Sequence, residues 1–305
     1  MTDPQGFRNP RVLLPFLLIT LIWGSTWIVI KDQLGVVPPG WSITYRYMIA
    51  AAAMFIFARV SAGSLAVGGR GHLLAAAIGF PQFFLNFNFV YAAEQHVTSG
   101  LVAVVFALLM VPNSALAWMF FRQRVSGGFI IGSAVAMIGV ALLFVQEMRA
   151  SPTSTSEVLV GIGLTLGGVL AASSANVMQL SEAVRSRPIP TMLAWAMFYG
   201  TLFNAAFSLV IHGPPVVEAR IGYWAGLVYL GVFASALAFT LYFGIIRAVG
   251  AGKAAYSSLL VPIIAMLLST LFEDYRWSSL ALAGGLVALA GLFIALRSRP
   301  TAQSG

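Results

Sequence analysis

The sequence contains no cysteine and few charged or histidine residues. Of its 305 residues, none is Cys, 3 are His and only 9% are Asp, Glu, Lys or Arg, whereas roughly a quarter of an average soluble protein is charged. Without cysteine, disulfides and thiolate metal sites are impossible. His72, His96 and His212 fall at loops or at the ends of apolar runs, so no metal cluster is expected.

The patterns that carry common enzyme chemistry are missing as well. The sequence has no Gly-x-Ser-x-Gly, no His-Glu-x-x-His and no phosphate-binding loop. An ATP-driven pump within this chain is therefore excluded, and an intramembrane hydrolase is only a distant alternative. We expect no enzyme activity, no catalytic residue, no metal and no cofactor.

Long apolar runs fill nearly all of the chain. Hydrophobic residues make up 59% of it, and the mean hydropathy is +0.90. A helix of about 20 apolar residues crosses ~30 Å of hydrocarbon, and lipid offers backbone amides no partners outside a helix or a closed barrel. Barrel strands would be shorter and alternating. We therefore expect an all-α, multi-pass protein of the cell (inner) membrane with ten transmembrane helices, at residues 12–31, 42–61, 72–92, 98–121, 127–146, 158–184, 191–211, 222–245, 252–272 and 278–297.

The charges are distributed unequally between the loops on the two sides. With the N-terminus in the cytoplasm, Lys31, Arg149, Arg220 and Arg276 lie outside and every other base except Arg46 lies inside. By the positive-inside rule, both termini are cytoplasmic (N-in, C-in). The net charge of +8 is then an orientation signal, and nucleic acid is not expected as a partner. The lipid bilayer is one expected partner, and a monomer is compatible with the sequence, which leaves the oligomeric state open.

The two halves of the chain echo each other. Tyr91 precedes Pro112 by 21 residues, and Tyr242 precedes Pro262 by 20. The spacing of two glycines in the fifth span is repeated in the tenth, at Gly132, Gly139, Gly284 and Gly291. Such matches at an offset of about 150 residues indicate a duplicated five-helix unit.

An odd number of spans per unit makes the second unit enter the membrane from the opposite side. We expect inverted repeats over residues 12–146 and 158–297, as in alternating-access carriers. A channel is an alternative, which the inverted repeats and the mid-span prolines disfavour.

The residues Trp23-Gly24-Ser25 in span one, the Tyr–Pro pairs and the Gly-rich closing spans resemble the drug/metabolite transporter superfamily in its ten-helix EamA-like branch. Within it, the pattern looks most similar to aromatic amino-acid exporters. The resemblance implies export of amino acids and other small metabolites. Small multidrug-resistance relatives carry a Glu in the first helix, and span one has none, which disfavours proton antiport.

Polar residues deep in the spans are the first candidates for substrate binding. Each costs free energy in lipid and should face protein, water or substrate. The third span carries Asn86, Asn88 and Tyr91, and the sixth carries Asn176 and Gln179. The alternative is that these side chains only hydrogen-bond neighbouring helices, which is worth about 0.6 kcal/mol on average.

The prolines give a second group of candidates. Pro112 and Pro262 lie near mid-span, where a proline removes one backbone hydrogen bond, and matched helix breaks point to a binding site. A simple packing kink is the alternative. The side chains near these breaks that we expect to contact substrate are Phe106, Asn113, Tyr256 and Ser257.

Trp23 and Trp27 lie one turn apart on the same face of the first span. Their indoles are suited to stack on an aromatic substrate or to attract its ammonium group, unless they are merely packed or lipid-facing. Arg46 lies about a turn and a half from the outer end of its span, so we expect it to snorkel to the interface, with a substrate-carboxylate role as the alternative. Glu94 and Glu182 lie at span ends, so no buried carboxylate is expected.

Together these features predict a transmembrane exporter of small metabolites, amino acids above all. A carrier of phosphorylated or nucleotide-linked sugars is the main alternative. Such anions favour several inward Lys or Arg residues, and only Arg46 and Lys253 are candidates.

Overall fold

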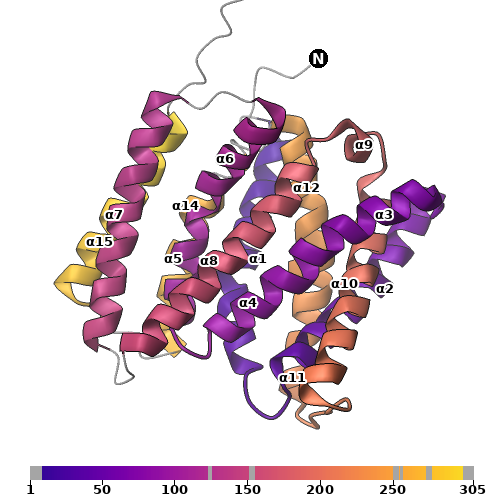
Figure 1. Ribbon diagram of the computed structural model, residues 1–305, viewed down its shortest axis with the longest axis horizontal. Helices are drawn as coiled ribbons and strands as arrows, with labels where there is room; N and C mark the ends of the chain where they lie inside the picture. Colours follow the sequence, from indigo (N-terminus) through magenta and orange to yellow (C-terminus); the bar gives the residue numbers. More distant parts are fainter. Residues whose placement is uncertain are drawn as a thin grey trace, which may run out of the picture.

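The chain is helical throughout its described part. A computed structural model describes residues 9–122, 126–150, 155–249, 254, 257–272 and 277–297 (Figure 1). Tyr256, one of the candidate residues, lies outside them. The helices are α1 (Pro10–Asp32), α2 (Pro39–Ser61), α3 (Gly68–Gly79), α4 (Asn86–Ala93), α5 (Ser99–Phe106), α6 (Met110–Phe121), α7 (Gly127–Ala150), α8 (Thr155–Met178), α9 (Glu182–Arg185), α10 (Ile189–His212), α11 (Ile221–Val228), α12 (Ala238–Val249), α14 (Ser257–Phe272) and α15 (Ser279–Arg297).

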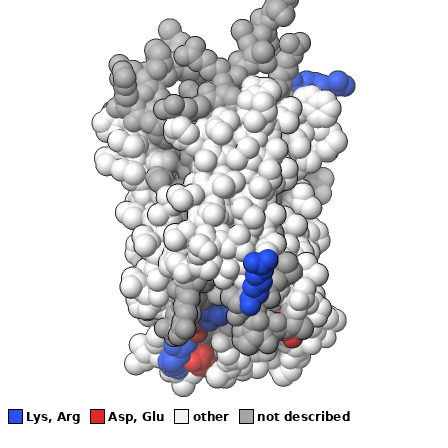
Figure 2. Space-filling model, turned by 90° about the vertical axis from the view of Figure 1, so that its left-hand side faces the viewer, with Lys and Arg blue, Asp and Glu red and all other residues white. Residues whose placement is uncertain are grey.

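The helices have the length and composition of membrane spans. In the part of the chain that the structure describes, seven helical segments are long and apolar enough to cross a bilayer. Three shorter apolar helices lie at Gly127–Leu143, Val261–Phe272 and Ser279–Gly291. The face in Figure 2 shows a wide band of uncharged residues, with coloured side chains only toward the two ends. The all-α membrane architecture is thus confirmed, while ten crossings and their orientation stay predictions.

Three of the long segments depart from regular α-helix in their middle. A π-helical stretch, η2 (Phe80–Leu85), joins α3 to α4, and a second, η4 (Tyr229–Leu237), joins α11 to α12. A 3₁₀ turn, η3 (Ala107–Leu109), joins α5 to α6 just before Pro112. Irregular turns of this kind are frequent at functional sites because they re-aim side chains and backbone groups.

Helices α7 and α15 form a separate antiparallel pair at the edge of the molecule (Figure 1). A Cβ atom on Gly139 would lie 2.2 Å from the amide nitrogen of Ala288, and one on Gly291 would lie 2.2 Å from that of Ala136. Gly139 and Gly291 are 152 positions apart, and so are Ala136 and Ala288, so the two contacts are made by equivalent residues of the two helices. The pair is therefore related by a local two-fold axis, and its backbones touch because glycine has no side chain.

Helices α2 and α10 form a second antiparallel pair. Gly40 near the start of α2 packs on Ser208 near the end of α10, and Phe55 near the end of α2 stacks edge-on against Trp195 near the start of α10. Trp195 also donates a hydrogen bond to the carbonyl of Leu65, 2.8 Å away, which ties α10 to the loop after α2.

At the opposite end, the loop between α10 and α11 folds over the start of α2. The indole of Trp41 donates to the carbonyl of Gly213 at 3.2 Å, and the hydroxyl of Tyr45 donates to that of Val216 at 3.0 Å. Arg220 closes this loop onto α1 through an ion pair with Asp32 at 3.0 Å. The carboxylates of Asp32 and Glu218 hold the pKa of Arg220 above its usual range. The start of α2 is therefore covered by protein.

Candidate functional site

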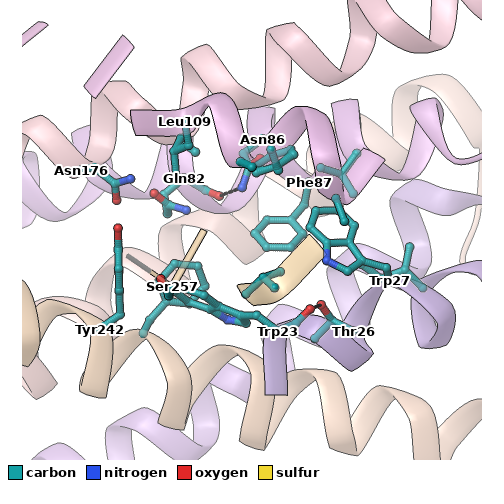
Figure 3. A pocket seen from close by; sticks show the side chains of 18 of the residues that line it. Trp23, Thr26, Trp27, Gln82, Asn86, Phe87, Leu109, Asn176, Tyr242 and Ser257 are labelled. Carbon is teal, nitrogen blue, oxygen red and sulfur yellow. Dashed lines mark hydrogen bonds between the residues drawn. The ribbon is translucent and has the colours of Figure 1, made fainter. Parts of the chain in front are cut away.

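A cavity of about 880 Å³, counting the space at its mouth, lies between the helices of both halves of the chain. Its wall comes from α1, α2, η2, α4, α5, η3, α6, α8, α12 and α14 (Figure 3). The lining residues are Trp23, Thr26, Trp27, Ile30, Arg46, Gln82, Asn86, Phe87, Val90, Ala103, Phe106, Ala107, Leu109, Met110, Ala172, Asn176, Phe239, Tyr242, Ser257, Val261 and Pro262. A mostly apolar cavity with a few polar groups is the usual form of a small-molecule site.

The two mid-span tryptophans of α1 both face the cavity. Trp23 packs edge-on against Tyr242 at 4.9 Å between ring centroids, and its indole nitrogen donates to the carbonyl of Ala234 at 3.1 Å. Trp27 packs against Phe106 at 5.3 Å. Within the described residues, the indole nitrogen of Trp27 has no hydrogen-bond partner. Three aromatic candidates from the sequence, Trp23, Trp27 and Phe106, thus line the same cavity.

Polar side chains also reach the cavity from η2, α4, α8, α12 and α14. Gln82 and Asn86 lie one turn apart, and Asn86 donates to the carbonyl of Gln82 at 3.4 Å. In the part of the chain that the structure describes, the side-chain oxygens of both amides lack a partner. Asn176 on α8 and Tyr242 on α12 point toward each other across the cavity (Figure 3). Ser257 is buried and donates to the carbonyl of Ala254 at 3.1 Å.

Arg46 does not snorkel to the interface, so that expectation is wrong. The side chain is 1% exposed and lines the cavity. The loop of residues 213–220 covers the start of α2, so the guanidinium has no short path to water on that side. Counting turns from the end of the span missed this covering loop.

Two candidates from the third span lie outside the cavity wall. Asn88 faces α10, where it donates to the side-chain oxygen of Asn204 at 2.7 Å. Tyr91 is fully buried, and its hydroxyl donates to the side-chain oxygen of Gln33 at 3.2 Å. In this structure both side chains therefore hydrogen-bond neighbouring parts of the protein, which is the alternative to substrate binding that the sequence left open.

Asn113 and Gln179 also lie away from the cavity. Asn113 is buried on α6 but does not line it. Gln179 follows α8 and lines a separate small pocket with Ile78 and Phe243. Of the candidates, the structure therefore brings seven to the cavity: Trp23, Trp27, Asn86, Phe106, Asn176, Ser257 and Pro262.

The two prolines behave differently. The helix that contains Pro112 changes to a 3₁₀ turn at residues 107–109, and Leu109 and Met110 line the cavity there although Pro112 does not. Helix α14 instead runs through Pro262 without a break, which corrects the expectation of matched interruptions. A proline removes only one intrahelical hydrogen bond, and a membrane helix tolerates this loss when its neighbours support it.

Glu94 is fully buried, contrary to expectation. It follows the last residue of α4, as its position in the sequence suggested, but its exposed fraction is 0%. Ser99 donates to its carboxylate at 3.1 Å, and the ammonium group of Lys31 donates to its backbone carbonyl. These contacts fill the space beyond Ile30 and Val90, the lining residues nearest to this end.

Sequence reasoning left out several residues that line the cavity, including Gln82, Phe87, Phe239 and Tyr242. For two of these residues, the sequence contained a pattern that indicates a place in the cavity wall. Gln82 precedes Asn86 by one helical turn and so shares its face. Tyr242 is the counterpart of Tyr91 in the repeat. Phe87 and Phe239 have no polar group that would mark them among the other apolar residues.

The EamA-like transporter family matches residues 11–145 and 159–297 of this chain. Protein PagO of Salmonella typhimurium is 24% identical over 292 residues, which cover 96% of this chain and 95% of that protein. A probable amino-acid metabolite efflux pump of Escherichia coli is 24% identical over 91% of this chain and 92% of its own length. A probable terminal-alkyne amino-acid exporter of Streptantibioticus cattleyicolor is 26% identical over 72% of this chain and 71% of its own length.

A solved crystal structure superposes on this chain with a TM-score of 0.68, covering 93% of this chain and 96% of that one. At 17% identity, this likeness shows the fold alone. The family match spans most of the sequence, and the cavity and apolar helices agree with it. The chain belongs to the EamA-like transporter family and is a multi-pass membrane transporter rather than an enzyme.

Proposed function

We propose that this protein exports small metabolites, amino acids including aromatic ones above all, by alternating access. The observation that carries the proposal is the cavity, which has aromatic walls and a few converging polar groups and is built from both halves of the chain. Indole and phenol rings suit an apolar or aromatic side chain, and amide groups suit the polar end of an amino acid. Relatives named as an amino-acid efflux pump and an amino-acid exporter support this substrate class.

The packing of α7 on α15 supports two halves of opposite orientation. The two helices are antiparallel and meet through equivalent residues, since Gly139 packs on Ala288 and Gly291 packs on Ala136. A two-fold axis perpendicular to the helices therefore relates them. Inverted repeats give such an axis in the plane of the membrane, and rocking of one half against the other is the usual route to alternating access. The charge bias of the loops supports cytoplasmic termini.

Hydrogen bonds between the two halves support one closed end. Gln33, the residue after α1, accepts from Tyr91 and donates toward the carbonyl of Tyr223 at 3.5 Å. The hydroxyls of Ser42 and Tyr223 lie 2.8 Å apart. These contacts join helices of the first half to α11 of the second beyond the cavity. They must break or move for substrate to pass at this end.

The alternative substrates, phosphorylated or nucleotide-linked sugars, fit the cavity less well. Their two or more negative charges favour several cationic groups, and Arg46 is the one charged side chain among the described lining residues. Counterflow in proteoliposomes, with a panel of amino acids, purines, sugars and cationic drugs, tests the proposal. We expect exchange with apolar and aromatic amino acids. Exchange with sugar phosphates alone would contradict it.

A further inference from the structure

The cavity wall contains a buried positive charge. Arg46 is 1% exposed, and the other described lining residues are apolar or uncharged. Neither of the ion pairs formed between described residues involves Arg46, because both belong to Arg220. A buried cation without an anionic partner is costly, so its place in a transport cavity calls for a ligand that supplies the opposite charge.

The guanidinium is held in place by Ser235 and by the rings of Phe87 and Tyr47. Its Nε donates to the hydroxyl of Ser235 on η4 at 3.1 Å. Its central carbon lies 4.3 Å from the centroid of the Phe87 ring, within cation–π distance. Among the described atoms, Nη1 has no hydrogen-bond partner. The side chain is thus fixed in direction and keeps a terminal donor for a ligand.

A guanidinium binds carboxylate through two parallel hydrogen bonds, because the two planar groups match in geometry. A phosphate monoester carries close to two negative charges at neutral pH and would leave one of them uncompensated here. A single carboxylate matches the single charge of the wall. Arg46 therefore favours a monocarboxylate over a phosphate as the anionic group of the solute.

The same region offers acceptors for a cationic group. The side-chain oxygens of Gln82 and Asn86 are buried and have no partner within the described ranges. Both residues line the same cavity as Arg46, and Phe87, the residue after Asn86, lies beside its guanidinium. An ammonium group is a donor that satisfies amide oxygens. The apolar body of the solute would then lie against Trp23 and Trp27.

We propose that Arg46 binds the carboxylate of the transported solute and Gln82 and Asn86 accept hydrogen bonds from its ammonium group, so that the cavity selects zwitterionic amino acids with apolar or aromatic side chains. This assignment rests on the proposed function and adds the orientation of the substrate and the residue that selects it. Amines without a carboxylate are excluded by Arg46.

The first test compares ligands on the unaltered, full-length protein in detergent. Apparent dissociation constants are taken from the rise in unfolding temperature with concentration of L-phenylalanine, L-leucine, their methyl esters and 3-phenylpropionate. The esters keep the ammonium group and the apolar body but lose the negative charge. We expect them to bind about 10- to 100-fold more weakly than the parent amino acids. Esters that bind as tightly as the amino acids would overturn the assignment.

The second test changes the arginine. In Arg46→Gln the ratio of ester to amino-acid dissociation constants should fall toward one, and in Arg46→Lys it should lie in between, because lysine keeps the charge but not the planar fork. Arg59→Gln is the control, since Arg59 is an exposed base that does not line the cavity. It should keep the wild-type ratio. If Arg46→Gln does not fold, the ester comparison and Arg46→Lys decide the matter; an unchanged ratio in Arg46→Lys contradicts the assignment.

The outcomes separate this inference from the proposed function. If the amino acids bind and are exchanged by the protein but their esters bind equally well, the Arg46 assignment falls and the proposed function stands. If 3-phenylpropionate binds through Arg46 and no amino acid does, the carboxylate site stands and amino-acid export falls. If none of these compounds binds, both fall.

Discussion

Replacing Gly291 by alanine should separate α15 from α7 and lower the stability of the protein. The added Cβ would lie 2.2 Å from the amide nitrogen of Ala136, whereas ordinary contact begins near 3.4 Å. The backbone of α7 cannot rotate away as a flexible side chain would, so the helices must move apart by about 1.2 Å at this point. Overpacking of this kind costs about 1–3 kcal/mol.

Part of this cost is offset by the helix propensity of alanine, which exceeds that of glycine by up to about 1 kcal/mol. With the full offset, a net loss of up to about 2 kcal/mol remains, which corresponds to a fall in unfolding temperature of up to roughly 8 °C. Gly285→Ala is the matched control on the same helix, because a Cβ there meets nothing within 4 Å. It should keep or raise the unfolding temperature.

The two-fold relation between the helices also predicts the effect of the equivalent substitution in α7. Gly139 meets Ala288 at the same 2.2 Å at which Gly291 meets Ala136, so Gly139→Ala should cost as much as Gly291→Ala within about 0.5 kcal/mol. Thermal unfolding of the purified protein in detergent, followed by tryptophan fluorescence, measures all three variants. Gly139→Ala and Gly291→Ala variants as stable as Gly285→Ala would refute the backbone contact.

Three other predictions test topology, site and coupling. Cysteines introduced at Thr2 and Ser304 of this cysteine-free chain should react with an impermeant thiol reagent only after cell lysis, and labelling of either one in intact cells would refute cytoplasmic termini. Asn88→Ala should lower the free energy of unfolding by about 1 kcal/mol, and with it the unfolding temperature, because the variant loses the bond to α10, while KM for amino acids should change little. Asn176→Ala should instead raise KM. The reverse pattern would move the site. Net flux should follow the substrate gradient, since the described cavity wall holds no carboxylate. Uphill uptake driven by an imposed proton gradient would contradict this prediction. If the Glu94→Gln variant then lost the uphill uptake, the coupling would be located at that buried acid.

The sequence was sufficient for the fold class because lipid leaves the backbone few choices. Any apolar run of about 20 residues must be helical in a membrane without a barrel, so composition and length carried that prediction. Trp23 and Trp27 both line the cavity for a related reason. Residues one turn apart share a face of a helix, and an aromatic pair at mid-span is more useful toward a cavity than toward lipid.

The helical period also explains one error and could have prevented it. Asn86 and Asn88 are two residues apart, which is about 200° around a helix, so they point in nearly opposite directions. Asn86 faces the cavity with Gln82, one turn before it, and Asn88 faces Asn204 on α10. The prediction treated all polar residues of the third span as one group, although the helical period places Asn86 and Asn88 on opposite faces.

The burial of Arg46 and Glu94 depends on contacts distant in sequence. Arg46 is enclosed because residues 213–220, from the other half of the chain, fold over the start of α2. Glu94 is enclosed where Lys31 from α1 and Ser99 from α5 meet the end of α4. Distance from the end of a span measures depth only when water or lipid headgroups surround that end. Here protein does, and no local pattern in the sequence reveals it.

Tyr91 and Tyr242 show the limit of the repeat as a guide to the site. They occupy matching positions in the two halves, yet Tyr242 lines the cavity beside Trp23, and Tyr91 is buried against Gln33 away from the cavity wall. If the halves are inverted repeats that work by alternating access, as we propose, they must differ in conformation whenever one end of the cavity is closed and the other is open. A repeat therefore predicts which residues are equivalent, while the conformation of the carrier determines which member of each pair meets the substrate.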